Sequence, residues 1–142
     1  KFQKNIPQNE KRAMDPKQLG NLGEKIAESY LKKKGYQILE KNYFFRIPGN
    51  PQKGEIDIIA KKQNIICFVE VKTLGLRGRD ALIAPEERVD WLKQRKIIKT
   101  AESWLMKNKI PLDVKWQIDV VSIRIDLENK KAKIRHFKNA VF

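Results

Sequence analysis

The chain has 142 residues, of which 41% are apolar, so it is long enough for one domain with a single core and too apolar for a disordered chain. Its 31 Lys and Arg outnumber 17 Asp and Glu, and the formal net charge of +14 favours a polyanionic partner, nucleic acid before an anionic membrane surface. One cysteine and one histidine exclude an internal disulfide, a multi-thiolate zinc site and a His-rich metal site.

The hydropathy of the chain also restricts the expected cellular location of the protein. No apolar run approaches the length of a transmembrane helix, and residues 1–17 lack the apolar core of a signal peptide. We therefore expect a cytoplasmic protein without a membrane segment. Cys67, inside an apolar run, is interpreted as a buried thiol, and His136, in a basic stretch, as a structural or surface residue.

The apolar pattern predicts an α/β domain preceded by an arm. Residues 1–18 are polar and are predicted to form a flexible basic arm, whereas residues 19–142 form a single domain. Helical spacing predicts helices at 19–34 and 85–108. The expected strands cover residues 36–45, 55–61, 65–72, 114–125 and 133–137, with loops at 46–53 and 73–84. The order α-β-β-β-α-β-β predicts a mixed sheet flanked by helices.

The second and third predicted strands form an antiparallel hairpin that carries the candidate chemistry. A two-residue turn at 63–64 places Asp57 opposite Glu70 and Glu55 opposite Lys72. Opposed residues point to the same side of a sheet, with Cβ atoms about 5 Å apart. Two carboxylates are therefore expected to converge, with a lysine one pleat away.

Two carboxylates this close repel each other unless a cation lies between them. Oxygen ligands without histidine or cysteine favour Mg²⁺ or Mn²⁺, which can polarise a phosphoryl oxygen and lower the pKa of a bound water. With Lys72 to orient that water or stabilise charge on the phosphate, this set suits phosphodiester hydrolysis. An ion-paired cluster on a solvated sheet face is the competing interpretation, although the apolar Ile66 and Phe68 on the same strand face count against it.

Residues on the two helices could complete this site. Glu24 lies three residues before Ala27, at the inner edge of an apolar stripe, where it is either a third carboxylate or a glutamate stabilised by the helix dipole. In the second helix, Lys93 and Gln94 continue the apolar stripe and are expected to lean toward the sheet. Lys96 adds positive charge nearby.

The sequence motifs around the hairpin are more specific for a protein family than the three site residues alone. Asp57, twelve residues and then Glu70-Val71-Lys72 resemble the D-x(n)-(D/E)-x-K motif of the restriction-endonuclease-like PD-(D/E)xK superfamily. The further motifs are Gly20-x-x-Gly23-Glu24-x-x-Ala27-x-x-Tyr30-Leu31, Gly35-Tyr36-x-Ile38-Leu39, Gly54-Glu55-Ile56-Asp57, Phe68-Val69-Glu70-Val71-Lys72 and Ile118-Asp119-Val120-Val121. By these motifs residues 19–142 resemble the YraN-like uncharacterised bacterial family, which is similar to archaeal Holliday-junction resolvases in fold and site.

This resemblance implies a restriction-endonuclease-like fold, a metal site from Asp57, Glu70 and Glu24, and Lys72 as the catalytic lysine. Two departures from the family concern substrate contacts: the loop that begins at Arg46 is longer than usual, and an arginine common in the family is replaced by leucine. Arg77 or Arg79 could take the place of that arginine. The predicted nucleic-acid contacts are Arg46, Arg77, Arg79, Lys93, Gln94 and Lys96.

The resulting hypothesis is a Mg²⁺- or Mn²⁺-dependent endonuclease that hydrolyses phosphodiester bonds in DNA. The resolvase likeness adds branched or structured DNA as the substrate and a homodimer as the assembly. Two alternatives stay open: a module that binds nucleic acid without cleaving it, and an assembly domain whose basic surface meets an acidic protein. Replacing Lys72 distinguishes the first two, because only the nuclease needs it, and the assembly domain needs no metal.

Overall fold

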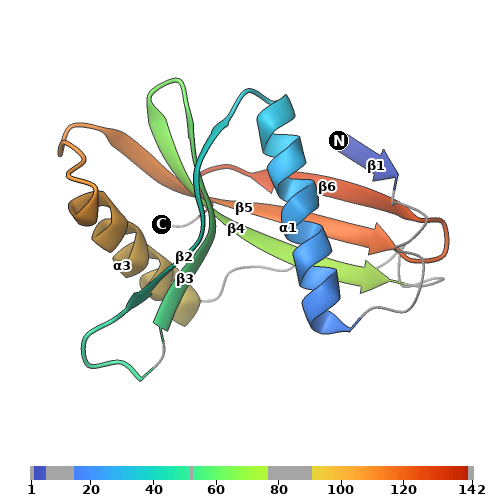
Figure 1. The fold of residues 1–142 in the computed structure, drawn as a ribbon, viewed down its shortest axis with the longest axis horizontal. Coiled ribbons are helices and arrows are strands. Elements are labelled where there is room, and N and C mark those ends of the chain that lie inside the picture. Colours follow the sequence, from blue (N-terminus) through green and yellow to red (C-terminus); the bar gives the residue numbers. More distant parts are fainter. Residues whose placement is uncertain (1, 6–14, 52, 77–90, 141–142) are drawn as a thin grey trace.

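The computed structural model describes residues 2–5, 15–51, 53–76 and 91–140 (Figure 1). Within these ranges the chain forms two helices and six strands. Their bounds are β1 (Phe2–Asn5), α1 (Pro16–Lys33), β2 (Gln37–Arg46), β3 (Lys53–Lys62), β4 (Ile65–Leu76), α3 (Trp91–Lys107), β5 (Lys115–Asp126) and β6 (Lys131–Phe137).

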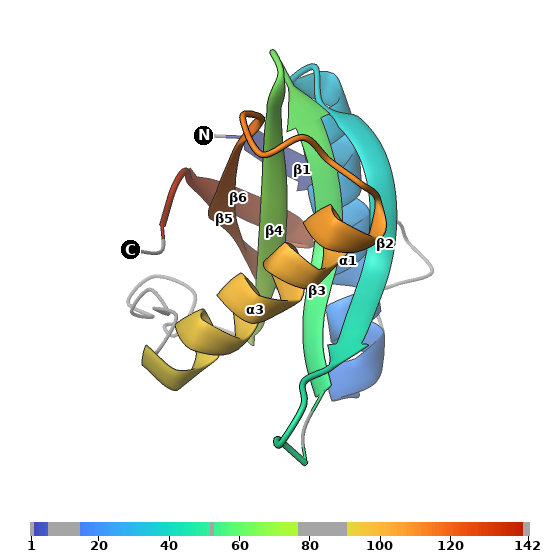
Figure 2. The ribbon, with the colours of Figure 1, turned by 90° about the vertical axis from the view of Figure 1, so that its left-hand side faces the viewer.

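The strands form one mixed sheet in the order β1-β6-β5-β4-β3-β2. Neighbours are antiparallel except β4 and β5, which run parallel and have α3 between them in the chain. Figure 2 shows α3 in front of the sheet and α1 behind it. The predicted α/β class and the order α-β-β-β-α-β-β are confirmed, and β1 adds an edge strand that was not predicted.

Each helix buries its apolar stripe against its own side of the sheet. On α1, Ile26 and Leu31 are buried in one core cluster with residues from β3 to β6. On α3, Ala101 and Trp104 are buried in a second cluster, where the rings of Trp104 and Phe68 meet edge to face at 5.7 Å. The sheet between the two clusters is covered on both sides, which explains the nearly continuous apolar run of β4.

Helix α1 begins at Pro16, three residues earlier than predicted. Asp15 Oδ1 accepts a hydrogen bond from the N–H of Gln18 at 2.8 Å, and Gln18 Oε1 accepts one from the N–H of Asp15 at 3.1 Å. This reciprocal capping box, with proline at the first helical position, fixes the helix start. The segment predicted as a flexible arm thus contains β1 and the first turn of α1, and its flexibility stays a prediction.

Strand β4 extends to Leu76, against the prediction of a loop from residue 73. Its parallel pairing with β5 continues without interruption to Leu76↔Asp126. Gly75, which suggested a loop, lies where a Cβ atom would come within 3.0 Å of Leu19. The glycine thus serves close packing of α1 on the strand.

The hairpin between β3 and β4 turns where it was predicted. Gln63 (φ 51°) and Asn64 (φ 67°) both have left-handed backbone conformations, as a two-residue type I′ turn requires. The predicted register is confirmed from Lys62↔Ile65 to Ile58↔Val69.

Beyond Ile58 the two strands part, so the predicted pairs Asp57–Glu70 and Glu55–Lys72 do not form in the ladder. The physical reason is that each strand follows its other partner. β3 stays paired with β2 as far as Arg46↔Lys53. β4 stays paired with β5 as far as Leu76↔Asp126. Figure 1 shows β2 and β3 diverging from β4 and β5. We call this opening in the sheet the fork.

Candidate metal and nucleic-acid site

The fork holds a polar pocket of about 330 Å³, called here the carboxylate pocket. Its lining consists of Lys53, Glu55, Asp57, Glu70, Val71, Lys72, Lys96 and Ile97. The structure thus brings Asp57, Glu70 and Lys72 into one pocket although the ladder ends before them. In place of a ladder bond, Asp57 Oδ2 accepts a hydrogen bond of 2.7 Å from the N–H of Val71, which ties the diverging strands together.

The Asp57 carboxyl in the carboxylate pocket has a shifted pKa. Burial raises its pKa from 3.8 to about 6, and the N–H of Val71 opposes that rise. The negative charges of Glu24, Glu70 and Glu55 raise the pKa further. Near neutral pH this ionised carboxylate therefore lies in a buried and negative environment, which a cation would relieve.

Two lysines of the pocket already pair with its glutamates. Lys72 Nζ lies 3.5 Å from Glu70 Oε1, and both side chains are largely buried, at 18% and 12% exposure. Lys53 Nζ lies 3.1 Å from Glu55 Oε1, but these two side chains are about half exposed. Solvent screens an exposed pair strongly, so the Glu70–Lys72 pair is the one that shapes the charge within the pocket.

The donor chemistry of the pocket fits Mg²⁺ or Mn²⁺. Asp57 and Glu70 offer carboxylate oxygens, and the lining contains no histidine or cysteine. In the described part of the chain, no three His, Cys, Asp or Glu side chains are grouped so as to hold a metal by themselves. Mg²⁺ is commonly held by one or two carboxylates and keeps water or substrate phosphate oxygens in its other positions. Two carboxylates therefore suffice for such a cation.

Glu24 lies in a neighbouring pocket of about 240 Å³ that it shares with Lys41. Burial and the charge of Glu55 raise the pKa of Glu24, while Lys41 lowers it. The structure therefore brings Glu24 near enough to influence Asp57 without placing it in the carboxylate pocket. Its role as a third metal ligand stays a prediction.

The predicted nucleic-acid contacts divide into three groups. Lys96 lines the carboxylate pocket, and Arg46 pairs across the strands with Lys53, which also lines it. Gln94 is half-buried on α3 and lies outside the pocket lining. The predicted contacts outside the described residues are Arg77, Arg79 and the side chain of Lys93.

An exposed aromatic residue at the rim was not predicted. Phe44 is 58% exposed and pairs across the strands with Glu55, and Lys53 Nζ lies 4.6 Å from the centroid of its ring. A basic side chain beside an exposed ring is the combination that binds a nucleic-acid strand through its phosphates and bases. Lys53 was predicted to lie in the loop 46–53. The alternation of residues 53–62 is the signal that could have placed Lys53 in a strand.

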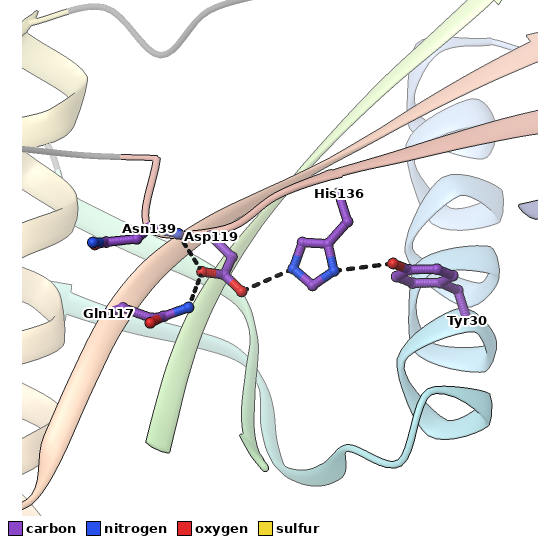
Figure 3. A network of polar contacts seen from close by, with 5 residues as sticks. All are labelled: Tyr30, Gln117, Asp119, His136 and Asn139. Atoms are coloured by element: carbon purple, nitrogen blue, oxygen red, sulfur yellow. Dashed lines mark hydrogen bonds and ion pairs between the residues drawn. The ribbon is translucent and has the colours of Figure 1, made fainter. Parts of the chain in front are cut away.

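A second group of polar residues lies away from the fork, around the buried Asp119 (Figure 3). Asp119 Oδ2 lies 2.8 Å from His136 Nε2, and His136 Nδ1 lies 3.0 Å from the hydroxyl of Tyr30. Asp119 Oδ1 accepts hydrogen bonds from Gln117 Nε2 and from the N–H of Asn139, each at 2.9 Å. His136 is therefore a structural residue, which was one of its two interpretations. The sequence signal for this network was an aspartate within an apolar run.

Burial would raise the pKa of Asp119, but hydrogen bonds from His136, Asn139 and Gln117 together hold it below its usual value. Burial also raises the pKa of the Tyr30 hydroxyl, and the charge of Asp119 adds to this rise. Tyr30 therefore stays protonated near neutral pH. The network ties α1, β5 and the end of β6 together and does not create a tyrosinate nucleophile.

Comparisons with known proteins agree on a family. Residues 23–123 match the model of Uncharacterised protein family UPF0102. A UPF0102 protein of Alkaliphilus oremlandii (strain OhILAs) is 42% identical over 124 residues, which cover 87% of this chain and 97% of that protein. One from Clostridium botulinum (strain Loch Maree / Type A3) is 39% identical over 124 residues, covering 87% of this chain and 94% of that protein.

A solved structure of Pyrococcus furiosus SfsA in complex with Ca²⁺ matches at a TM-score of 0.39 and 12% identity. The match covers 90% of this chain and 65% of SfsA, slightly less than two thirds of its length.

Neither α1 nor α3 is long and apolar enough to cross a membrane.

Proposed function

We propose, from the premise that this chain belongs to the UPF0102 family, that its carboxylate pocket is the active site of a Mg²⁺- or Mn²⁺-dependent endonuclease acting on DNA. The observation that carries this proposal is the convergence of Asp57, Glu70 and Lys72 in one pocket of a chain with net charge +14. The positive charge attracts a polyanion, while the local carboxylates repel it unless a cation intervenes. A phosphodiester with a divalent cation satisfies both requirements.

Asp57 and Glu70 would hold the cation, which when bound polarises a phosphoryl oxygen and makes water a better nucleophile. Lys72, kept in the pocket by Glu70, donates hydrogen bonds to the attacking water or to the phosphate oxygen on which negative charge grows. Water forms a new bond to phosphorus, the bond from phosphorus to one sugar oxygen breaks, and that oxygen leaves with a proton. The N–H of Val71 holds the Asp57 carboxylate in position for this role.

The rim of the pocket suits a strand that passes through the fork. Lys96 on one side and Lys53 with Arg46 on the other offer charge to phosphates that flank the reacting one. Phe44 offers a ring on which a base can stack, and stacking of this kind contributes roughly 1–3 kcal/mol per base.

A module that binds nucleic acid without cleaving it is the second candidate. It is favoured by the lack, within the described residues, of three grouped metal-ligating side chains. Both candidates bind through charge, so their affinity should fall steeply with added salt. They differ only in whether a divalent cation produces cleavage.

The test is cleavage of labelled duplex DNA, single-stranded DNA, a four-way DNA junction and single-stranded RNA in Mn²⁺ and in EDTA. Wild-type protein is expected to cut in Mn²⁺ only, and the best-cut substrate gives the class. Lys72→Ala should lower the cleavage rate by roughly 10²–10³, because it removes a donor needed only as charge builds in the transition state.

Lys61→Ala is the matched control, because Lys61 is an exposed lysine of β3 outside the carboxylate pocket. It loses the same charge and should cut like the wild type. Equal gel shifts by all three proteins with no cutting by any would reject the nuclease and leave the binding module. A wild type that neither cuts nor binds any of these substrates would reject both.

A further inference from the structure

The β2–β3 pair carries an exposed ring next to the carboxylate pocket that hydrolysis itself does not need. Beyond Ile58 the two strands stay paired, and there Phe44 lies opposite Glu55 and Arg46 opposite Lys53. Opposed residues of an antiparallel pair point to the same side of the sheet. Lys53 and Glu55 line the pocket, so the ring and the arginine are each the cross-strand neighbour of a lining residue.

This side of the β2–β3 pair faces away from α3. Tyr43 is buried in the cluster that α3 covers, and a Cβ atom on Gly54 would meet the side chain of Thr100 on α3. Side chains alternate along a strand, so Phe44 and Glu55 point the other way. Figure 1 shows this end of β2 and β3 apart from α1. Phe44 and the Glu55 side chain are each 58% exposed, so a ligand can reach both.

Along this side, the kinds of side chain alternate as the parts of a nucleic-acid strand do. Asp57, in the pocket, would hold the cation at the cleaved phosphate. Two residues along β3, or about 7 Å, Glu55 stands beside the Phe44 ring. Two residues further, the cationic Lys53 and Arg46 are direct neighbours. A phosphate, a base and the next phosphate match these three positions in turn.

The middle position suits a base better than a phosphate. The Glu55 carboxylate repels phosphates but can accept hydrogen bonds from the amino group of a base edge. The Phe44 ring offers a stacking surface, and a base is open to such stacking where it is splayed out of a duplex. Among the exposed large apolar side chains of the described residues, Phe44 is the aromatic one, and the others are Leu39, Met106 and Leu112.

The outer position suits a phosphate. Like charges directly opposed on two strands destabilise a sheet, and an anion near both removes the repulsion. Lys53 Nζ lies 3.1 Å from Glu55 Oε1 and 4.6 Å from the centroid of the Phe44 ring, with its side chain half exposed. Solvent weakens both contacts, and base stacking is the stronger interaction of the ring. A bound strand can therefore replace them, with the base on the ring and the phosphate on the ammonium.

We propose that the carboxylate pocket takes a DNA strand whose bases are unpaired, with Phe44 as a specificity-determining residue. The ring stacks on the base next to the phosphate at Asp57, Glu55 accepts hydrogen bonds from the edge of that base, and Lys53 and Arg46 bind the following phosphate. Single-stranded, bulged or flapped DNA fits this surface, and a duplex or a fully paired four-way junction does not. The inference rests on the proposed function, because that function brings a strand into this pocket.

The first test measures binding without cleavage, in EDTA. The probes are a short single-stranded oligonucleotide that carries the fluorescent base 2-aminopurine, and the same oligonucleotide in a duplex. Stacking quenches 2-aminopurine, so the wild type should quench the single strand saturably. Phe44→Ala should lose the quenching and bind the single strand roughly tenfold more weakly, with duplex binding unchanged. Phe44→Trp keeps a ring and should behave like the wild type.

Met106→Ala is the matched control, because Met106 is an exposed apolar side chain of α3 outside the pocket lining, and it should bind like the wild type. Phe44 is itself exposed, so Phe44→Ala is expected to fold. Three results would overturn the inference: equal single-strand binding by the wild type and Phe44→Ala, equal losses of single-strand and duplex binding in that variant, or no binding by the wild type.

Cleavage in Mn²⁺ separates this inference from the proposed function. If both hold, the wild type cuts single-stranded DNA faster than duplex DNA, and Phe44→Ala loses that preference. If no DNA is cut but Phe44 still governs single-strand binding, the nuclease fails and the selection of unpaired strands stands on a binding module. If Phe44→Ala cuts single-stranded and duplex DNA at wild-type rates, the nuclease stands and the inference is overturned.

Discussion

Asp57→Asn is expected to stabilise the metal-free protein near neutral pH. Burial raises the pKa of Asp57 from 3.8 to about 6, so ionisation above that pH opposes folding. A difference of about two pKa units corresponds to on the order of 2–3 kcal/mol in the free energy of unfolding. The asparagine oxygen can still accept the hydrogen bond from Val71, so the variant loses the charge and keeps the contact.

The pH dependence has a definite sign. Below pH 3.8 Asp57 is protonated in the folded and unfolded states, and the two proteins should be equally stable. Between pH 3.8 and about 6 the unfolded carboxyl ionises first, so the wild type progressively loses stability relative to the variant. Above that window the difference is constant.

Urea unfolding across this pH range measures the effect, with Glu102→Gln as the control because Glu102 is exposed on α3 outside the carboxylate pocket. Added Mg²⁺ should stabilise the wild type and leave Asp57→Asn unchanged, since a ligand stabilises only the state that binds it. A variant less stable than the wild type above pH 6 would contradict the charge environment described for Asp57.

Asp119→Ala should strongly destabilise the protein. It removes the partner of His136, Gln117 and the N–H of Asn139 at a fully buried position. Leaving such donors unsatisfied and opening a cavity costs about 2–5 kcal/mol. Asp113→Ala, at an exposed position just before β5, should stay within about 0.5 kcal/mol of the wild type.

This stabilisation also depends on pH. Hydrogen bonds hold the pKa of Asp119 below 3.8 in the folded state, so its contribution is present above pH 3.8 and is lost as pH falls below that value. The difference between the wild type and Asp119→Ala should therefore shrink in acid. Denaturant unfolding at neutral and acid pH measures it, and equal stability of the two proteins at neutral pH would mean that the network contributes nothing.

The hairpin and its polar residues could be predicted from the sequence because their causes are local. A two-residue turn and side-chain alternation fix the register from Lys62↔Ile65 to Ile58↔Val69. The fork could not be predicted in this way, because it depends on how β3 and β4 pair with strands distant in the chain. As a result, Asp57 and Glu70 share a pocket without sharing a ladder pair.

The errors at the element ends have two different causes. The start of α1 is a local signal, because Asp15, Pro16 and Gln18 form the pattern of cap, proline and capping glutamine that begins a helix. The end of β4 could not be predicted locally, since the strand character of residues 73–76 comes from pairing with β5. β1 likewise depends on an edge of β6 far along the chain.

The network around Asp119 shows how far the partners of a buried polar residue can be predicted from the sequence. An aspartate between Ile118 and Val120 signals a buried charge that needs partners, but the pattern does not say which. Its partner His136 lies 17 positions away on β6. His136 in turn meets the hydroxyl of Tyr30 on α1, across a separation of 106 residues. Only the folded chain brings them together.

The central claim, that Asp57 and Glu70 hold a divalent cation in the fork, is tested most directly by calorimetric titration of Mn²⁺ above pH 6, where Asp57 ionises. The wild type and Glu102→Gln should show saturable binding, and Asp57→Asn and Glu70→Gln should each lose it. Binding by both of these variants as tight as that of the wild type would place any cation elsewhere and contradict the site.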